Sequence, residues 1–264
     1  MRQRLGQHFL INKGVIQKIV NALSLKEGDF VVEIGPGHGE LTKELVKHDP
    51  RLNIVAIEKD LGLAASIRLL MPNQDKIEVV EGDALKVLGG IISKHSLEAR
   101  GYKIVGNIPY YITGYLLRLI SELENKPELV VLTIQKEVAD RVCAKPPKMN
   151  LLAASVQFWA EAEIIEYVPK EDFSPAPEVD SAIIRLTTRN FDKKTSKKYY
   201  ETIRILFKQP RKTILNNILD YFSDTEVDKN EINEKLRNLG IKPSERAQNL
   251  DIETIKKLSQ VLYN

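Results

Sequence analysis

The sequence contains a single cysteine, Cys143, and no long apolar run. One cysteine cannot form an intramolecular disulfide, and no other Cys or His lies near it in the sequence, so we expect an inert thiol in the core or on a helix face. No apolar run approaches the roughly 20 residues that span a bilayer. The stretch Met1 to His8 lacks the apolar segment of a secretory signal. Together these absences predict a cytoplasmic protein that does not bind membranes.

The chain has 264 residues, of which 43% are hydrophobic. This length accommodates one large domain, or a large and a small one, and the apolar content supports a well-packed core. The formal net charge of +3 is modest, so the distribution of charge along the chain is more informative than its sum.

Short apolar runs alternate with helical patterns from residue 12 to about Gln135. The predicted helix Asn12 to Leu23 carries its apolar residues at helical spacing. The predicted strands are the apolar run from Phe30 into the glycine-rich turn and the runs at residues 54–58, 77–84, 103–106 and 129–134. This alternation predicts an α/β fold, with a parallel sheet covered by helices on both faces.

Beyond this region, Pro146-Pro147 interrupts the chain before an apolar helical segment that contains Trp159. Residues 164–168 and 182–186 are then expected to form a terminal pair of strands.

From Thr195 onward the apolar spacing is helical, so we predict a small all-helical domain of residues 191–264 after a larger domain of residues 1–190. Between Lys193 and Lys212 this domain is strongly basic, with Glu201 as the one acid. Its cations are Lys193, Lys194, Lys197, Lys198, Arg204, Lys208, Arg211 and Lys212. The balancing acids come only afterwards, at Asp220, Asp224, Glu226 and Asp228. Such a run can be a solvated helix face or a surface that binds nucleic-acid phosphates.

The stretch Asn107-Ile108-Pro109-Tyr110 follows an apolar run and is expected at the edge of the sheet. The exocyclic amine of adenine is a poor nucleophile, because its lone pair is delocalised into the ring. The Asn107 carboxamide and a backbone carbonyl beside Pro109 can accept the two N–H bonds of this amine, which draws the lone pair out of conjugation. Pro109 fixes the local φ, and Tyr110 offers a ring on which a base can stack. The alternative is a strand-to-helix turn with a buried tyrosine.

An apolar strand also runs into a glycine-rich turn, from Phe30 to Gly39. Gly35 and Gly37 allow a ligand to approach the backbone, and the following helix offers free N–H groups. The third glycine comes one residue earlier than in a dinucleotide-binding loop. Glu33, beside the turn, would repel a pyrophosphate and suits a ligand that carries an ammonium and a sulfonium. Both features favour S-adenosylmethionine over NAD as the cofactor.

Two further acids come at the ends of the next strands. Glu58 lies about twenty residues past the glycines, where a ribose-binding carboxylate sits in doubly wound folds. Asp83 ends the following strand and can accept a hydrogen bond from the amino group of a cofactor's adenine ring. A single acid at a strand end is most often only solvated, but three at successive strand ends, with Asn107, indicate a cofactor site.

With these motifs, the chain resembles the S-adenosylmethionine-dependent rRNA adenine N6,N6-dimethyltransferases that modify small-subunit rRNA. The resemblance covers nearly the whole chain. It rests on Gly6-Gln7-His8-Phe9-Leu10, Glu33 to Gly37, Glu58, Gly82-Asp83, Asn107 to Tyr110, Gln135 to Ala139, Phe173 to Ala182, Phe207 to Thr213 and Arg246 to Leu250.

The resemblance implies a Rossmann-like class I methyltransferase sheet with a helical carboxyl-terminal domain. It implies cofactor contacts at His8, Leu10, Glu33, Gly35, Gly37, Glu58, Asp83 and Asn107. It also implies that Asn107, Pro109 and Tyr110 handle the target adenine, and that Lys208, Arg211 and Lys212 contact RNA.

Two positions depart from the pattern of this family. Many bacterial members carry Asn where this chain has His8, so His8 either binds the carboxylate of the cofactor or is merely a loop histidine. Pro210 replaces a common Arg and removes at most one phosphate contact.

The segment from Phe173 to Ser181 is expected to be a stiff, extended loop, because Pro175 and Pro177 favour polyproline geometry. Phe173 can cover the face of the target base opposite Tyr110, or it can fill the core beneath the loop.

The mechanism predicted from the resemblance is direct methyl transfer to adenosine N6, without a metal or a covalent intermediate. The expected partner is 16S rRNA, at two adjacent adenosines near its 3′ end, in the small subunit or its precursor, and the protein is expected to be a monomer. The alternatives are a large-subunit rRNA dimethyltransferase of the antibiotic-resistance type, an assembly factor with dispensable catalysis, and a glutamine or DNA-adenine methyltransferase. The last class has Pro where this chain has Ile108.

Overall fold

The computed structural model describes residues 7–71, 75–97, 101–191, 193–223 and 228–263. Gly6 of the amino-terminal motif, Asp224 and Glu226 of the acidic stretch, and the side chains of Lys193 and Lys194 lie outside this description. The chain divides into two compact units, the first of residues 1–139 and 161–188 and the second of residues 140–160 and 189–264.

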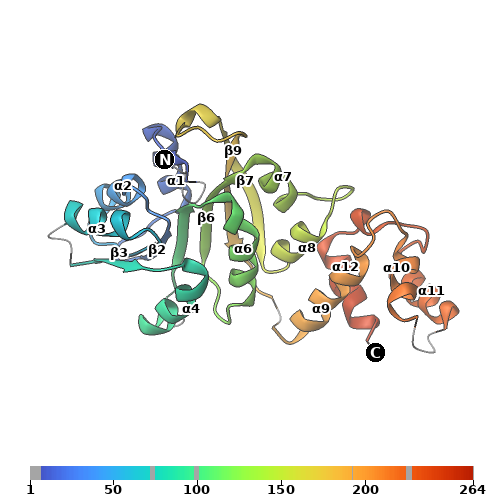
Figure 1. Cartoon of the computed structure of the whole chain (residues 1–264). Coiled ribbons are helices and arrows are strands. Elements are labelled where there is room, and N and C mark those ends of the chain that lie inside the picture. Colours follow the sequence, from blue (N-terminus) through green and yellow to red (C-terminus); the bar gives the residue numbers. More distant parts are fainter. Residues whose placement is uncertain (1–6, 72–74, 98–100, 192, 224–227, 264) are drawn as a thin grey trace. The chain divides into compact units, whose positions relative to one another are not determined.

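A seven-stranded sheet forms the centre of the first unit (Figure 1). Its strands lie in the order β4 (Ile77–Glu81), β3 (Asn53–Glu58), β2 (Phe30–Ile34), β5 (Lys103–Asn107), β6 (Leu129–Gln135), β9 (Ser181–Thr188) and β7 (Ala160–Val168). The first five strands are parallel, and β9 is antiparallel to β6. The predicted α/β class, the five parallel strands and the terminal strand pair are therefore confirmed.

Helices cover both faces of the middle of the sheet. Successive residues of a strand point to opposite faces, and nearly all residues of β2, β3 and β6 are buried. The helices between the parallel strands are α2 (Glu40–His48), α3 (Leu61–Leu70), α4 (Ala84–Lys94) and α6 (Thr113–Glu122), the last preceded by the 3-10 turn η1 (Tyr110–Ile112). The amino-terminal helix α1 (Lys13–Ala22) packs against α2.

Short polar residues start these helices. The Asn12 side chain accepts from the N–H groups of Gly14 and Val15 and so caps α1. Asp60 caps α3 and Asp83 caps α4 in the same way. Asp83, just after β4, therefore stabilises the start of α4 in addition to any contact with a ligand.

A two-stranded ribbon joins the amino-terminal segment to the loop after η2 (Lys170–Asp172). In it, β1 (Phe9–Leu10) pairs antiparallel with β8 (Phe173–Ser174), and Leu10 lies opposite Phe173. The expected extended loop thus begins as a strand, because its backbone finds a partner that local sequence does not reveal.

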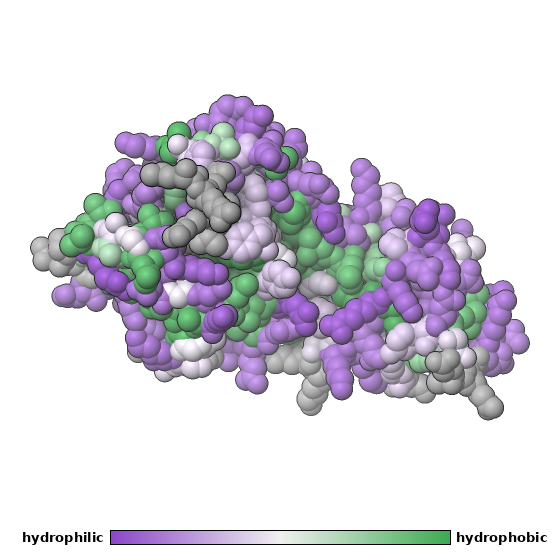
Figure 2. Space-filling view, viewed as in Figure 1, coloured by the Kyte–Doolittle hydropathy of each residue, from purple (hydrophilic) through white to green (hydrophobic). Residues whose placement is uncertain are grey.

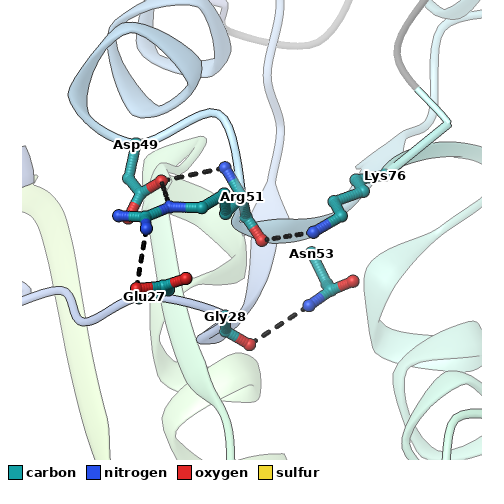
Figure 3. A network of polar contacts seen from close by, with 6 residues as sticks. All are labelled: Glu27, Gly28, Asp49, Arg51, Asn53 and Lys76. Carbon is teal, nitrogen blue, oxygen red and sulfur yellow. Dashed lines mark hydrogen bonds and ion pairs between the residues drawn. The ribbon is translucent and has the colours of Figure 1, made fainter.

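A polar network ties together the loops at the amino-terminal ends of β2 and β3 (Figure 3). Arg51 binds Asp49 through Nε at 2.9 Å and Glu27 through Nη1 at 2.7 Å. Its carbonyl accepts from Lys76 at 3.1 Å. These groups lie at the strand ends opposite the Gly35 turn, so they support the sheet rather than the candidate site.

The second unit is helical. It holds α8 (Leu151–Gln157), α9 (Lys193–Leu206), α10 (Ile214–Tyr221), α11 (Lys229–Asn238), the 3-10 turn η3 (Ala247–Asn249) and α12 (Ile252–Val261), while α7 (Lys136–Val142) begins in the first unit. The chain enters this unit for the second time at Arg189, next to the boundary placed at residue 190.

The segment Asp140–Ala160, which the sequence analysis places in the first domain, groups with these helices instead. The physical reason is aromatic packing, since the ring of Phe158 stacks on Tyr199 with centroids 4.1 Å apart. The sequence predicts Trp159 within a helix, but α8 ends at Gln157 and Trp159 lies in the turn before β7. No helix within the described residues is long and apolar enough to cross a membrane.

Candidate active site

A cavity lies where the carboxyl ends of β2, β3 and β5 meet. The strand order reverses between β2 and β5, and such a switch point is the usual ligand crevice of an open α/β sheet. Ten of the predicted site residues line the cavity, namely His8, Leu10, Glu33, Gly35, Gly37, Glu58, Asn107, Pro109, Tyr110 and Phe173. The lining also includes Gln7, Phe9, Ile16, Ile19, Pro36, His38, Glu40, Leu41 and Ile108, which the sequence analysis did not name as site residues.

The glycine turn after β2 has a backbone that only glycine adopts easily. Gly35 and Gly37 have φ of +68° and +58°. A Cβ on Gly37 would lie 2.8 Å from the ring of Phe9. The Gly37 N–H donates to Glu58 Oε2 at 3.0 Å. The Gly37 N–H is therefore engaged, and the missing Cβ of Gly37 makes room for the ring of Phe9.

Glu58 is nearly buried at the end of β3, and backbone groups hold both of its oxygens. Oε2 accepts from Gly37 and Oε1 accepts from the Asp60 N–H at 2.9 Å. Each carboxylate oxygen has a second lone pair. The orientation of the Glu58 carboxylate is thus fixed, and each oxygen can still accept a hydrogen bond from a hydroxyl group.

Glu33 is fully buried within β2, and only one of its oxygens has a partner. Thr42 of α2 donates to Oε2 at 2.7 Å, whereas Oε1 has no hydrogen-bond partner among the described residues. Burial is the main cause that raises the pKa of Glu33 to about 7, and the charge of Glu58 adds to it. An unpaired buried carboxyl that lines a cavity is suited to a cationic ligand group.

Asp83 does not line the cavity. Lys59 donates to its Oδ2 at 2.9 Å, and the Leu85 N–H donates to Oδ1. The Lys59 hydrogen bond is the main cause that lowers the pKa of Asp83. Lys59 is a neighbour that the sequence analysis missed, and no local pattern points to it.

The Asn107 carboxamide at the end of β5 has a defined orientation. Its Nδ2 donates to the backbone carbonyl of His8 at 2.8 Å. A carbonyl can only accept, so this contact identifies which end of the amide is nitrogen. Oδ1 is left to accept, and none of the described residues donates to it or to the Ile108 carbonyl. Two unused acceptors are therefore adjacent in the chain.

Besides the contact of its carbonyl with Asn107, His8 makes two contacts through its ring. Its Nδ1 lies 2.8 Å from the Pro175 carbonyl, so Nδ1 carries the hydrogen. Its ring lies 5.9 Å from the ring of Tyr110, at an interplanar angle of 28°. The sequence analysis expects His8 either to bind the cofactor or to be a loop histidine, and it does not predict these contacts with Pro175 and Tyr110.

Tyr110 is half-buried, and its hydroxyl is anchored. The hydroxyl lies 2.7 Å from Oγ of Ser181, the first residue of β9. Burial raises the pKa of Tyr110, which therefore stays protonated at neutral pH. Ser181, which the sequence analysis quoted only as part of a longer motif, holds the ring in place.

Phe173 is 3% exposed and both lines the cavity and belongs to the apolar core with Leu10, Ile16 and Ile19. Its contact with a target base stays a prediction.

The predicted RNA-binding cations lie in the second unit, between α9 and α10. Lys208 and Arg211 are exposed. Lys212 forms an ion pair with Asp220.

Comparison with known proteins agrees with this geometry. The family model described as ribosomal RNA adenine dimethylase matches residues 1–262. Ribosomal RNA small subunit methyltransferase A of Geobacillus thermodenitrificans is 35% identical, over 99% of this chain and 90% of that protein. The protein of the same name from Mycoplasma capricolum is 36% identical, over 98% of this chain and 96% of that protein.

Solved structures are similar along almost the whole chain. A dimethyladenosine transferase from Plasmodium falciparum has a TM-score of 0.75 at 27% identity, over 95% of this chain and 96% of that chain. The 23S rRNA methyltransferase ErmE also has a TM-score of 0.75, at 24% identity, over 97% of this chain and 100% of that chain, which shows a shared fold. On the strength of the family match over nearly its full length, this chain belongs to the ribosomal RNA adenine dimethylase family.

Proposed function

We propose that this protein transfers methyl groups from S-adenosylmethionine to N6 of adenosines in 16S rRNA, in the small subunit or its precursor, and forms N6,N6-dimethyladenosine. The observation that carries the proposal is the Asn107 carboxamide, whose Nδ2 donates to the His8 carbonyl, while no described residue donates to Oδ1 or to the neighbouring Ile108 carbonyl. This pair of acceptors matches the two N–H bonds of an adenine amine.

The lining of the cavity fits the cofactor. The unpaired Oε1 of Glu33 is a partner for the ammonium group, and Glu58, with its spare lone pairs, is a partner for ribose hydroxyls. At Gly35 a Cβ would have no neighbour closer than 3.7 Å, so this position leaves room for the ligand at the backbone. When bound, S-adenosylmethionine supplies a methyl group that its sulfonium already activates.

The residues of the chain prepare the adenine amine. Asn107 Oδ1 and the Ile108 carbonyl accept its two N–H bonds, which turns the nitrogen lone pair out of conjugation with the ring. The ring of Tyr110, anchored by Ser181, supports the base by stacking. A carboxamide and a carbonyl bind the amine without deprotonating it, and the amine loses its proton after it is methylated.

The helical unit supports binding of the RNA. Lys208 and Arg211 are exposed cations in a segment with few acids. The adenosine has to leave its base stack to reach the cavity, and an unpaired RNA region lowers that cost. The choice of 16S rRNA follows the names of the curated relatives.

The experiment offers labelled S-adenosylmethionine with unmethylated small subunits, large subunits and naked rRNA in parallel. We expect dimethyladenosine, identified by nuclease digestion and mass spectrometry, in the small-subunit RNA. Label in large-subunit RNA would instead indicate a large-subunit rRNA dimethyltransferase of the antibiotic-resistance type. Cofactor binding without any label would favour an assembly factor.

A variant pair tests the assignment of Asn107. Asn107→Ala should lower kcat about 100-fold or more, by analogy with the loss of one transition-state hydrogen bond, and should leave RNA affinity unchanged. Asn216→Ala, at an exposed position of α10, is the matched control and should retain full activity. Equal activity of the two variants would refute the role of Asn107.

A further inference from the structure

A second cavity lies wholly within the helical unit, along one face of α9. Its volume is about 670 Å³, which lies in the range of small-molecule sites. Three cations, two tyrosines and one acid line it, namely Lys197, Arg204, Lys208, Tyr200, Tyr221 and Glu201. We call this cavity the α9 cleft. On the face visible in Figure 2, the surface of the helical unit is mostly hydrophilic.

The cations of the α9 cleft are available to a ligand. Lys197, Arg204 and Lys208 are all exposed, and none forms an ion pair or hydrogen bond through its side chain within the described residues. Lys197 and Arg204 are seven residues apart on α9 and so lie on one face of the helix, and Lys208, in the turn after α9, lines the same cavity, so the three charges form a stripe. One anion faces them, and its charge is partly engaged, because Glu201 Oε1 accepts the Tyr221 hydroxyl at 2.6 Å. The lining therefore has an excess of positive charge.

The tyrosines add flat apolar surface beside these charges. Tyr221 is 43% exposed, although it is a large aromatic residue, and its hydroxyl is fixed by Glu201. The Tyr200 hydroxyl donates to the Ser155 carbonyl at 3.3 Å. Sites that bind single-stranded nucleic acid combine a positive groove for the phosphates with aromatic rings for the bases.

We propose that the α9 cleft binds an unpaired nucleotide of the RNA substrate, with its phosphate on the Lys197–Arg204–Lys208 stripe and its base against Tyr221. This assignment rests on the proposed function, because that function makes RNA the partner. An acidic peptide would use the same cations but would gain little from the tyrosine rings. The cleft is thus a recognition site for RNA in the helical unit itself, and it is built from residues other than those of the methyl-transfer cavity.

The first test measures the anisotropy of a short fluorescein-labelled oligouridylate over a range of salt concentrations. The triple variant Lys197→Gln, Arg204→Gln, Lys208→Gln should bind at least tenfold more weakly at low salt. The slope of log K against log salt should fall by about 0.7, which is the contribution of one phosphate contact on a single strand.

The matched control removes the same charges from exposed positions outside the α9 cleft, as Arg237→Gln, Lys242→Gln, Lys257→Gln. It should change the affinity less than twofold. Equal losses in the two triple variants would show a general charge effect and would overturn the proposal.

The second test separates stacking from hydrogen bonding at one position. Tyr221→Leu should weaken binding of the oligouridylate about fivefold or more, as expected for the loss of one base stack. Tyr221→Phe loses only the contact to Glu201 and should bind within twofold of the unchanged protein. Thermal melting verifies that each variant is folded. Equal affinity of the Leu and Phe variants would refute the stacking role.

Photo-crosslinking gives an independent readout of position. A 4-thiouridine-containing oligonucleotide should crosslink to the peptides that contain Tyr221 or Tyr200, and crosslinks confined to other peptides would overturn the proposal. Polyglutamate that competes with the RNA as well as unlabelled oligouridylate would likewise overturn it in favour of an acidic protein partner.

These outcomes are distinct from a failure of the proposed function. The triple variant should bind S-adenosylmethionine like the unchanged protein, because the α9 cleft shares no residue with the first cavity. Oligonucleotide binding without methyl transfer would refute the proposed function and leave the α9 cleft intact. Methyl transfer with equal RNA affinity of the two triple variants would refute only the cleft.

Discussion

Glu33 leads to a prediction that links cofactor binding to proton release. Burial raises the pKa of this carboxyl from 4.5 to about 7, which corresponds to roughly 3 kcal/mol against the charged form. If the cofactor ammonium pairs with Oε1, the complex stabilises the carboxylate and lowers its pKa. Binding below pH 7 must then release the proton that Glu33 holds.

The magnitude follows from the titration of one site. Binding should release about 0.9 proton at pH 6 and about 0.1 at pH 8, and affinity should rise nearly tenfold per pH unit up to about pH 7. Calorimetry in two buffers of different ionisation enthalpy measures the released protons directly. S-adenosylhomocysteine keeps the ammonium and lacks the sulfonium, so an equal release with both ligands identifies the ammonium as the partner of Glu33.

Glu33→Gln is the control, because it keeps the shape of the side chain and cannot ionise. Its affinity should not vary with pH through this group. The reasoning is refuted if the unchanged protein binds with a flat pH profile from pH 5.5 to 8, or if both proteins release the same number of protons.

The same pKa shift predicts an effect on stability without ligand. A carboxyl whose pKa is raised on folding favours the folded state below its unfolded pKa, and this contribution is lost as pH rises through the folded pKa. As pH rises from 4.5 to 7, the unchanged protein should therefore lose stability relative to Glu33→Gln. The measurement is the free energy of unfolding of both proteins by urea denaturation.

Further predictions concern packing and buried charge. Gly106→Ala should lower the free energy of unfolding by about 1–3 kcal/mol, since its Cβ would lie 2.4 Å from a backbone oxygen of β2. Gly90→Ala in α4, where a Cβ meets nothing within 4 Å, should instead stabilise by about 0.5–1 kcal/mol. The free energy of unfolding of both variants is measured by urea denaturation. A change in the same direction for both would contradict the close approach of Gly106 to β2. Asp29→Ala should cost roughly 3 kcal/mol, because it removes the carboxylate 2.6 Å from the buried ammonium of Lys103 and leaves that charge only the Ser24 carbonyl. The double variant with Lys103→Met should recover part of this loss, and a further loss would contradict the pairing. Phe173→Ala should lower methyl transfer much more than cofactor affinity if the ring faces the target base, and equal losses in kinetics and calorimetry would assign it to the core alone.

Much of the fold could be predicted because it depends on local pattern. The continuous apolar runs of β2, β3 and β6 require burial on both faces, and their alternation with helices favours parallel order. Glu33, Gly35, Glu58 and Asn107 follow from their places near strand ends, because parallel strands bring their carboxyl ends to one edge. The role of each residue toward a ligand stays a prediction.

Contacts between distant segments could not be predicted in this way. The segment Asp140–Ala160 joins the helical unit because Phe158 finds Tyr199, and nothing in its own periodicity indicates that partner. The α9 cleft also required the structure, since the sequence shows a basic stretch but not that Tyr221 lies beside it.

The sequence by itself determined the α/β architecture, the family and the residues at the strand ends, since periodicity and motif spacing are local properties. Only the tertiary structure decided how those residues are held. The His8 carbonyl that orients Asn107 is 99 residues away in the chain, and the Ser181 hydroxyl that anchors Tyr110 is 71 residues away. Such hydrogen bonds form only after the sheet has brought the strand ends and the β1–β8 ribbon together, so their geometry is a product of the folded chain.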